Sequence, residues 1–158
     1  MKIFVINGPN LNRLGKREVN IYGDLSLDEI NEKITNHFEN QAEIYFFQSN
    51  DEGEIISVIG EADEKYDAIV INPAAYSHYS IAILDALKGI SIPSIEVHLS
   101  NIYKREDFRK ISVTANAAIG VISGLGWKGY ILAIEFLLNE YKDIHKNNIF
   151  AWKGCNIN

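Results

Sequence analysis

The sequence predicts an α/β fold with three layers: a doubly wound, five-stranded parallel sheet between two layers of helices. Two observations lead to this prediction. Short apolar runs alternate along the chain with stretches of helical periodicity, and such runs are typical of strands buried on both faces of a sheet. In addition, 158 residues suit one domain with a sizeable core, and five strand units fit that length. We therefore expect a single domain over residues 1–158.

The first half of the chain begins with a short buried strand at Ile3–Ile6. After a basic loop, Ser26 is a candidate helix N-cap, and Glu29 three residues later completes a capping box. Apolar residues at helical spacing carry this helix to about Phe38. The half ends with a strand and a short helix, expected at 43–49 and about 53–64.

The second half repeats this alternation. Pro73 stops the third strand, and Gly89 closes the helix after it. The elements expected here are strands at 66–73, around 95–97 and at 117–123, and helices at about 80–87 and about 127–141. This order predicts a flavodoxin-like sheet, in which ligands bind beyond the carboxyl ends of the strands.

Charge and composition exclude several classes of partner. The formal net charge of −6 argues against nucleic acid, because phosphate binding needs clustered lysine and arginine. A single cysteine, Cys155, can form neither an internal disulfide nor a cysteine-rich zinc site, so we expect a reducing, cytoplasmic setting. No apolar run approaches the roughly 20 residues that span a membrane.

Polar residues gather at the carboxyl edge of the expected sheet. Turn chemistry alone explains some of them, but it accounts poorly for a histidine and a glutamate that enter the edge from one strand. We therefore expect one site built from four loops. Its candidates after successive strands are Asn10, Arg17 and Tyr22; Gln48, Ser49, Asn50 and Glu52; Asn72 and His78; and Glu96, His98 and Ser100.

Glu96 and His98 stand two apart on a strand and therefore share a face. A carboxylate beside an imidazole can hold the ring in the orientation that general acid–base catalysis needs. A structural ion pair is the commoner alternative. A metal site with His78 is a third, disfavoured because no spacing here repeats a known ligand motif.

Tyr22 follows Arg17 in the basic loop "RLGKREVNIYG". A free phenol has a pKa near 10, so only about 0.1% is ionised at pH 7. A guanidinium within roughly 4–6 Å lowers the pKa of a neighbouring acid by about 1–3 units. Arg17 beside Tyr22, helped by a second cation such as Arg109, could therefore make a tyrosinate base; a packing role for the ring is the alternative.

Two further motifs have more than one interpretation. "GLGWKGY" (124–130) matches the glycine pattern of dinucleotide-binding loops, but the acidic residue and second strand of that unit are missing, so tight packing explains the glycines more simply. A nucleotide- or flavin-binding module stays the alternative function, although "NGPNLNRLG" offers amides and an arginine rather than a phosphate loop. "IYKREDFRK" (102–110) is either a solvated helix face with a Glu106–Lys110 pair or an arginine clamp for a carboxylate.

Four segments, "NGPNLNRLGKREVNIYG", "QSNDEG", "NPAAYSHYSIAILDAL" and "IEVHLSNIYKREDFRK", closely resemble the type II 3-dehydroquinate dehydratases in order and spacing. The resemblance implies a flavodoxin-like hydro-lyase of the shikimate pathway. It implies anti elimination of water from 3-dehydroquinate through an enolate, giving 3-dehydroshikimate with no metal or cofactor. It also implies a dodecamer built as a tetramer of trimers.

The resemblance assigns a role to each matching residue. It makes Tyr22 the base, Arg17 the cation that keeps it ionised and Asn10 the holder of a water beside the enolate oxygen. It makes His98 the general acid and Glu96 the carboxylate that supports it. The implied substrate contacts are Asn72, His78, Leu99, Ser100 and Arg109.

The resemblance also brings Asp85 to the active site of a neighbouring subunit. We expect Asp85 to point outward from its helix, with Ile81, Ile83 and Leu84 packing on the opposite face. Residues at about 13–24 would form a mobile lid, in which Val19 replaces the proline of many family members. The tail at about 143–158 has no counterpart in the family.

Overall fold

The sheet has five parallel strands in the order β2-β1-β3-β4-β5. The computed structural model describes residues 1–16 and 24–141. The strands are β1 (Lys2–Asn7), β2 (Glu43–Gln48), β3 (Ala68–Asn72), β4 (Ser94–His98) and β5 (Gly120–Ser123). This order is that of flavodoxin-like sheets, so the predicted fold class is confirmed.

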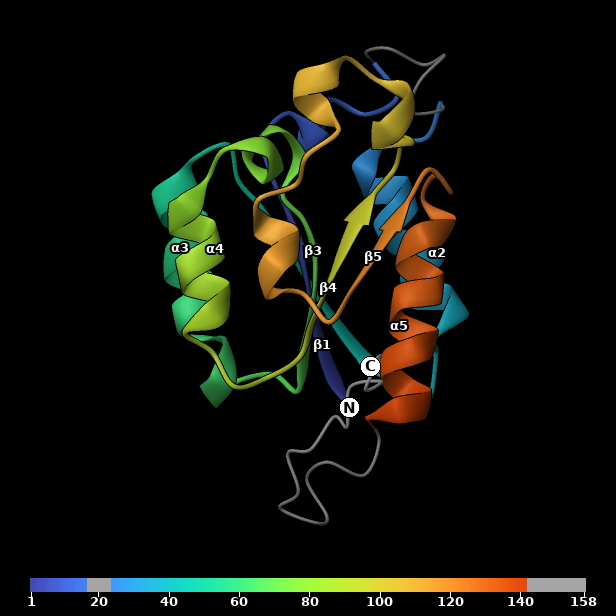
Figure 1. Cartoon of the computed structure of the whole chain (residues 1–158). Helices are drawn as coiled ribbons and strands as arrows, with labels where there is room; N and C mark the ends of the chain where they lie inside the picture. Colours follow the sequence, from blue (N-terminus) through green and yellow to red (C-terminus); the bar gives the residue numbers. More distant parts are fainter. Residues whose placement is uncertain (17–23, 142–158) are drawn as a thin grey trace, which may run out of the picture.

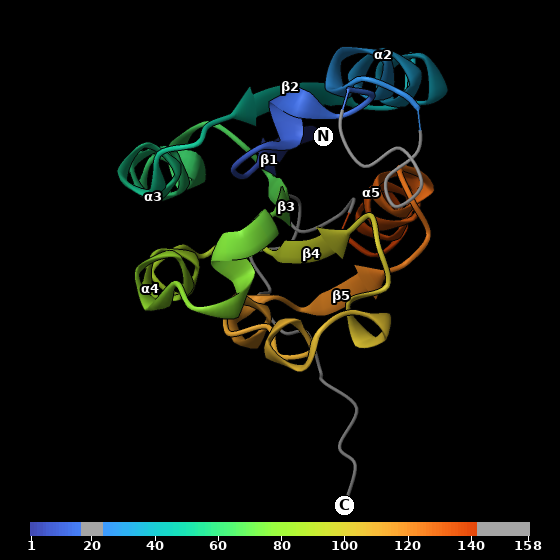
Figure 2. The same cartoon turned by 90° about the horizontal axis from the view of Figure 1, so that it is seen from above.

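Helices cover both faces of the sheet. In Figure 1 the pair α3 (Glu52–Gly60) and α4 (Ile81–Lys88) lies on one side, and the pair α2 (Leu27–His37) and α5 (Lys128–Glu140) lies on the other. The view from above shows the sheet between the two pairs (Figure 2). Among the described residues, no helix combines the length and the apolar character that crossing a membrane requires.

Two separate hydrophobic cores hold these layers together. Alternate residues of a strand point to opposite faces, so Ile3 and Val5 pack toward α2 and α5, while Phe4 and Ile6 pack toward α3 and α4. Ile34 of α2 is fully buried in the first core. The sheet therefore separates two independently packed halves.

Side-chain caps mark the helix starts that the sequence predicts. Ser26 Oγ accepts a hydrogen bond from the Glu29 N–H, and the Glu29 carboxylate accepts one from the Ser26 N–H at 2.8 Å, which completes the predicted capping box. At α4, Ser80 Oγ accepts from the Ile83 N–H at 2.9 Å. Both caps satisfy donors that an uncapped helix leaves unpaired.

Three details differ from the sequence prediction. The helix expected at about 53–64 is two elements, because α3 ends at Gly60 and a 3₁₀ turn, η2 (Ala62–Glu64), follows it. The strand expected at 117–123 begins only at Gly120, since the chain before it forms another 3₁₀ turn, η6 (Thr114–Ala117). The expected packing of Ile81 is wrong: its side chain is 64% exposed.

The glycine-rich segment 124–130 serves turn formation and close packing. Gly124 and Gly126 have positive φ values of 89° and 59°. Their N–H groups donate to the carbonyls of His98 (3.1 Å) and Leu99 (2.9 Å). A Cβ on Gly129 would lie 3.1 Å from Val97 Cγ1, so the glycine lets α5 approach the sheet closely. These N–H groups hold the end of β4, which supports the packing interpretation over nucleotide binding.

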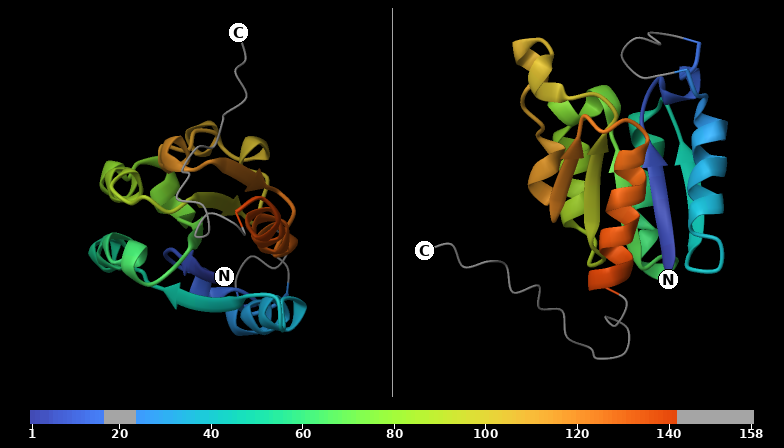
Figure 3. Two further views of the ribbon diagram at one scale, coloured as in Figure 1. Left: turned by 90° about the horizontal axis from the view of Figure 1, so that it is seen from below. Right: turned by 90° about the vertical axis from the view of Figure 1, so that its right-hand side faces the viewer.

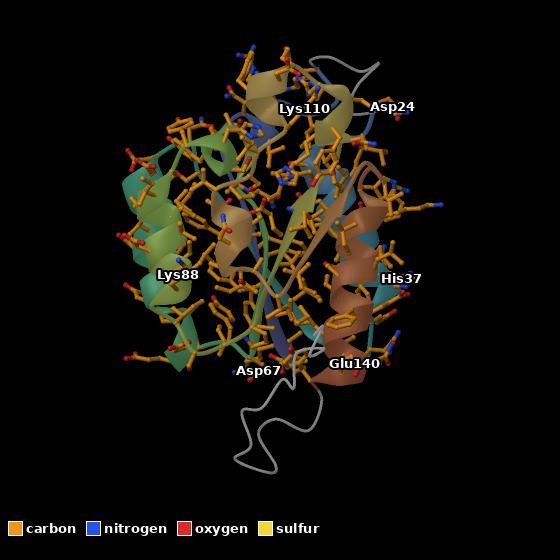
Figure 4. All side chains as sticks on the ribbon, in the orientation of Figure 1. Asp24, His37, Asp67, Lys88, Lys110 and Glu140 are labelled. Carbon is orange, nitrogen blue, oxygen red and sulfur yellow. The ribbon has the colours of Figure 1, made fainter. Side chains whose placement is uncertain are left out.

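The carboxyl ends of the strands meet at one edge, where loops and short 3₁₀ turns gather (Figure 3). These turns are η1 (Leu11–Arg13), η3 (Ala74–His78), η4 (Ile102–Lys104) and η5 (Asp107–Arg109). Lys110 lies at this edge, whereas Asp67 and Glu140 lie at the opposite end of the molecule (Figure 4). His37 is exposed on the flank of α2.

Candidate active site

A pocket of about 200 Å³ opens at the carboxyl edge of the sheet. Its walls come from the loops after β1, β3 and β4, at the edge where this type of sheet binds ligands. The expectation of four loops is wrong in one respect, because the loop after β2, with Gln48, Ser49, Asn50 and Glu52, does not line the pocket. The pocket brings together many of the side chains predicted from sequence: Asn10, Asn72, His78, His98, Leu99, Ser100 and Arg109.

His98 and Glu96 form a buried pair at this pocket. Nε2 of His98 lies 2.7 Å from Oε1 of Glu96. His98 is 5% exposed and lines the pocket, while Glu96 is fully buried behind it. A neutral ring that donates from Nε2 has its free lone pair on Nδ1. Nδ1 is therefore the atom through which His98 can exchange a proton with a ligand.

Two hydroxyl groups complete the surroundings of Glu96. Ser112 Oγ donates to Oε1 at 2.5 Å, and Thr114 Oγ1 donates to Oε2 at 2.6 Å. Together with His98, they provide the hydrogen bonds that offset the cost of burying a carboxylate. Neither hydroxyl could be predicted from the sequence, because nothing in the spacing of Ser112 and Thr114 connects them to β4.

The ring of His78 is also oriented by a backbone group. Its Nδ1 lies 2.8 Å from the carbonyl oxygen of Ile111. Since a carbonyl only accepts hydrogen bonds, Nδ1 carries a proton, and Nε2 is the free nitrogen of the neutral ring. His78 and His98 thus line the same pocket but use different ring nitrogens for these hydrogen bonds, Nδ1 in His78 and Nε2 in His98.

Asn10 lies at the pocket mouth in a left-handed backbone conformation, with a φ of 65°. Asparagine tolerates this conformation better than most residues. The Asn10 N–H donates to Asn50 Oδ1 at 2.8 Å, and the Asn10 side chain makes no capping bond to η1. The backbone is therefore held while the side-chain amide is not used as a helix cap.

Arginines make the outer wall of the pocket basic. Arg105 and Arg109 both approach Oε2 of Glu106, with Nε distances of 3.5 and 3.2 Å. A hydrogen bond to its own backbone N–H, and then the charges of these two arginines, lower the pKa of the Glu106 carboxyl. Arg13 lines the same pocket. Guanidinium groups suit a carboxylate ligand, so the clamp interpretation of segment 102–110 is the better supported.

The solvated-helix interpretation of that segment does not hold. The segment forms the turns η4 and η5 instead of an α-helix, and Lys110 pairs with Asp107 at 2.5 Å rather than with Glu106. Three-residue spacing brings these partners together in a 3₁₀ turn. The sequence indicates Arg105 and Arg109 through the clamp motif but not Arg13, because the spacing of Arg13 does not distinguish it from a surface cation.

Comparison with known proteins decides the family. A family model described as "Dehydroquinase class II" matches residues 1–138. The chain belongs to the class II dehydroquinases. The resemblance predicted from four motifs is thereby confirmed.

Similar dehydroquinases match over almost the whole chain. A 3-dehydroquinate dehydratase of Clostridium botulinum (strain Langeland) is 66% identical over 148 residues, which are 93% of this chain and 96% of that protein. One from Clostridium perfringens is 58% identical over 144 residues, covering 90% of this chain and all of that protein. The crystal structure of the type II dehydroquinase from Butyrivibrio crossotus is 52% identical, with a TM-score of 0.86, over 89% of this chain and 98% of that one.

The other residues that the resemblance assigns to the site are Tyr22, Arg17 and Asp85. Tyr22 and Arg17 lie outside the described residues, so their roles stay predictions, as do the lid and the tail. Asp85 is exposed on α4 and is not part of the wall of its own chain's pocket. Within residues 1–16 and 24–141, no group of three or more His, Cys, Asp or Glu side chains is arranged to hold a metal ion.

Proposed function

We propose that this dehydroquinase removes water from 3-dehydroquinate by anti elimination through an enolate, giving 3-dehydroshikimate in the shikimate pathway. Membership of the family supports the substrate and the reaction class. The observation that carries the mechanism is the pairing of His98, on the pocket wall, with the buried Glu96, with 2.7 Å between Nε2 and Oε1. The pair supplies a proton donor, His98, whose ring orientation is fixed by its hydrogen bond to Glu96.

The first step is removal of the proton beside the ketone. In this proposal Tyr22, ionised by the charge of Arg17, takes that proton, and the C–H electrons form the enolate. A water held by Asn10 donates a hydrogen bond to the enolate oxygen, where negative charge develops. The position of Asn10 at the pocket mouth supports this role.

The second step is loss of the β-hydroxyl group. The enolate electrons return to form the ketone and the new C=C bond, and the C–O bond breaks. His98, protonated on both nitrogens, gives the proton on Nδ1 to the departing oxygen, which leaves as water. Glu96 stabilises the imidazolium before transfer. Solvent then removes the proton from Tyr22 and returns one to His98.

Binding uses the polar and basic groups of the same pocket. The substrate is a carboxylate that carries several hydroxyl groups, and guanidinium and amide groups recognise both. We propose that the carboxylate and hydroxyl groups of the substrate bind to side-chain or main-chain groups of five residues: Asn72, His78, Leu99, Ser100 and Arg109.

We further propose that each site is completed by a neighbouring subunit within a trimer, and that trimers form a dodecamer. Asp85 is exposed and would reach the next active site. Ile81, one helical turn before it, and Tyr79 are 64% and 62% exposed, and exposed apolar residues grouped in this way are typical of contact surfaces.

One assay tests the function. Purified protein mixed with 3-dehydroquinate should produce the conjugated enone of the product, measured as increasing ultraviolet absorbance. A parallel sample of His98→Ala protein controls for spontaneous elimination. Absence of enone formation above that control would refute the proposed reaction.

A further inference from the structure

A hydrogen-bonded chain lies behind the pocket residue Asn72. Its centre is Tyr130 of α5, which is 1% exposed. The Tyr130 hydroxyl donates to Asn7 Oδ1 at 2.6 Å and accepts from Asn72 Nδ2 at 3.0 Å. Asn7 and Asn72 are paired neighbours at the ends of β1 and β3, and both are almost fully buried. Tyr130 therefore joins α5 to the two strands that end at the pocket.

One backbone group sets the direction of the whole chain. The N–H of Ala74 donates to Asn72 Oδ1 at 3.1 Å. A backbone N–H can only donate, so the oxygen of the Asn72 amide must face Ala74 and its nitrogen must face Tyr130. The Tyr130 oxygen consequently accepts this bond and gives its own proton to Asn7.

The arrangement leaves little freedom to the Asn72 amide. Rotating the amide by 180° would place Asn72 Nδ2 against the Ala74 N–H. Both groups are donors, and a buried polar group without a hydrogen-bond partner is costly. Burial also raises the pKa of the Tyr130 phenol, so the hydroxyl keeps the proton that it gives to Asn7. With Nδ2 giving one N–H to Tyr130, its other N–H is available at the pocket that Asn72 lines.

We propose that Tyr130 is a positioning residue for substrate binding, which fixes the Asn72 amide as a hydrogen-bond donor to an oxygen of the substrate. Tyr130 does not line the pocket and acts only through Asn72. The inference depends on the substrate contact proposed above for Asn72. It gives a role to the buried hydroxyl of Tyr130, whose ring belongs to the hydrophobic core on the α5 face of the sheet.

The test is the Tyr130→Phe variant, which keeps the ring and removes the hydroxyl. We expect KM for 3-dehydroquinate to rise about tenfold, the equivalent of losing one hydrogen bond of about 1.4 kcal/mol, with kcat within about twofold. Tyr141→Phe is the matched control. Its hydroxyl is also buried next to α5 but has no hydrogen-bond partner among the described residues, so KM should not change.

A double-mutant cycle with Asn72→Ala separates positioning from a general structural effect. If Tyr130 acts through Asn72, the double variant should bind no more weakly than Asn72→Ala alone. Should Tyr130→Phe fail to fold, as judged by circular dichroism, Asn7→Ala takes its place in the cycle. It removes the acceptor of the Tyr130 proton, and the same rise in KM is expected.

Two results would overturn the inference. In the first, Asn72→Ala alone raises KM, but Tyr130→Phe does not act through Asn72. Either Tyr130→Phe has a normal KM, or the KM of the double variant rises by the product of the two single effects. The positioning role then fails, but the substrate contact stands. In the second, Asn72→Ala itself leaves KM unchanged. The proposed contact then fails as well.

Discussion

Thr114 donates its hydroxyl to Oε2 of Glu96 at 2.6 Å, while His98 engages the other carboxylate oxygen. Replacing Thr114 by valine keeps the shape and leaves that oxygen unpaired. A hydrogen bond to a charged group contributes about 1.5–3 kcal/mol, so we expect a loss of about 2 kcal/mol in the free energy of unfolding. We also expect kcat to fall about tenfold with little change in KM, since in the proposed mechanism Glu96 orients the acid and does not bind substrate.

Steady-state kinetics and urea denaturation measure these two effects. The control is Thr35→Val in α2, at an exposed threonine whose hydroxyl donates to the Asn31 carbonyl of its own helix. Equal kinetic effects from the two variants would contradict the role of Thr114.

His98→Ala should separate the two steps of the reaction. Exchange of the proton beside the ketone should continue in deuterated water, because Tyr22 still forms the enolate, while net dehydration falls by several orders of magnitude. Proton NMR measures both rates in one sample. His37→Ala, at an exposed histidine whose ring lies 3.2 Å from Glu135 and packs edge-on against Phe38, should leave both unchanged. Parallel loss of exchange and dehydration in His98→Ala would show that the steps are not divided as proposed.

Tyr22→Phe should abolish turnover and leave the fold and much of substrate binding intact, since only the basic oxygen is removed. Arg17→Ala should also lose several orders of magnitude in rate, and Arg17→Lys less, because a lysine keeps the charge but not the planar group. Stopped-flow absorbance gives the rates, and circular dichroism checks the fold. A Tyr22→Phe enzyme with a tenth or more of the normal rate would rule out the tyrosinate base.

Asp85→Ala should weaken substrate binding or trimer stability by more than the roughly 0.5 kcal/mol of an ordinary surface change. Light scattering of the unaltered protein should give a mass of roughly twelve chains, the closed assembly proposed above. Glu32→Ala, an exposed carboxylate of α2, is the control and should match the unaltered protein. A fully active monomer at assay concentration would exclude both the shared site and the role of Asp85.

Tyr130 should make the protein sensitive to alkali. Burial raises its pKa in the folded state above the unfolded value of about 10. Above that pH the unfolded chain loses a proton that the folded chain keeps, so the free energy of unfolding falls as pH rises. The difference between unaltered and Tyr130→Phe protein should shrink by about 1.4 kcal/mol per pH unit above pH 10. Urea midpoints measured from pH 9 to 11 check this, and parallel curves would contradict it.

Local chemistry in the sequence predicted much of this structure. The start of α2 could be placed because Ser26 and Glu29 satisfy each other across a single turn. The pairing of Glu96 with His98 could be predicted because alternate residues of a strand share a face. In both cases the partners are near neighbours in the chain, where backbone geometry fixes their separation.

What could not be predicted depends on contacts between distant segments. Tyr130 and Asn7 are 123 positions apart, and no periodicity relates them. Thr114 lies 18 positions from Glu96, in a segment with no marked spacing. The error at Ile81 is different, because Ile81 and Asp85 are four residues apart and so share the exposed face of α4. An outward-facing Asp85 therefore already predicts that Ile81 is exposed as well.

The sheet divides the site between its two helical layers. Glu96 pairs in register with Ile71, so it and His98 face the core shared with α3 and α4, whereas Asn72 follows Val70 toward the core of α5. In the proposed mechanism the proton donor His98 and the substrate contact Asn72 are thus anchored in different cores. A substitution in one helical layer acts first on one of these two side chains and leaves the support of the other in place. Repacking one layer should therefore change proton transfer or the Asn72 contact separately.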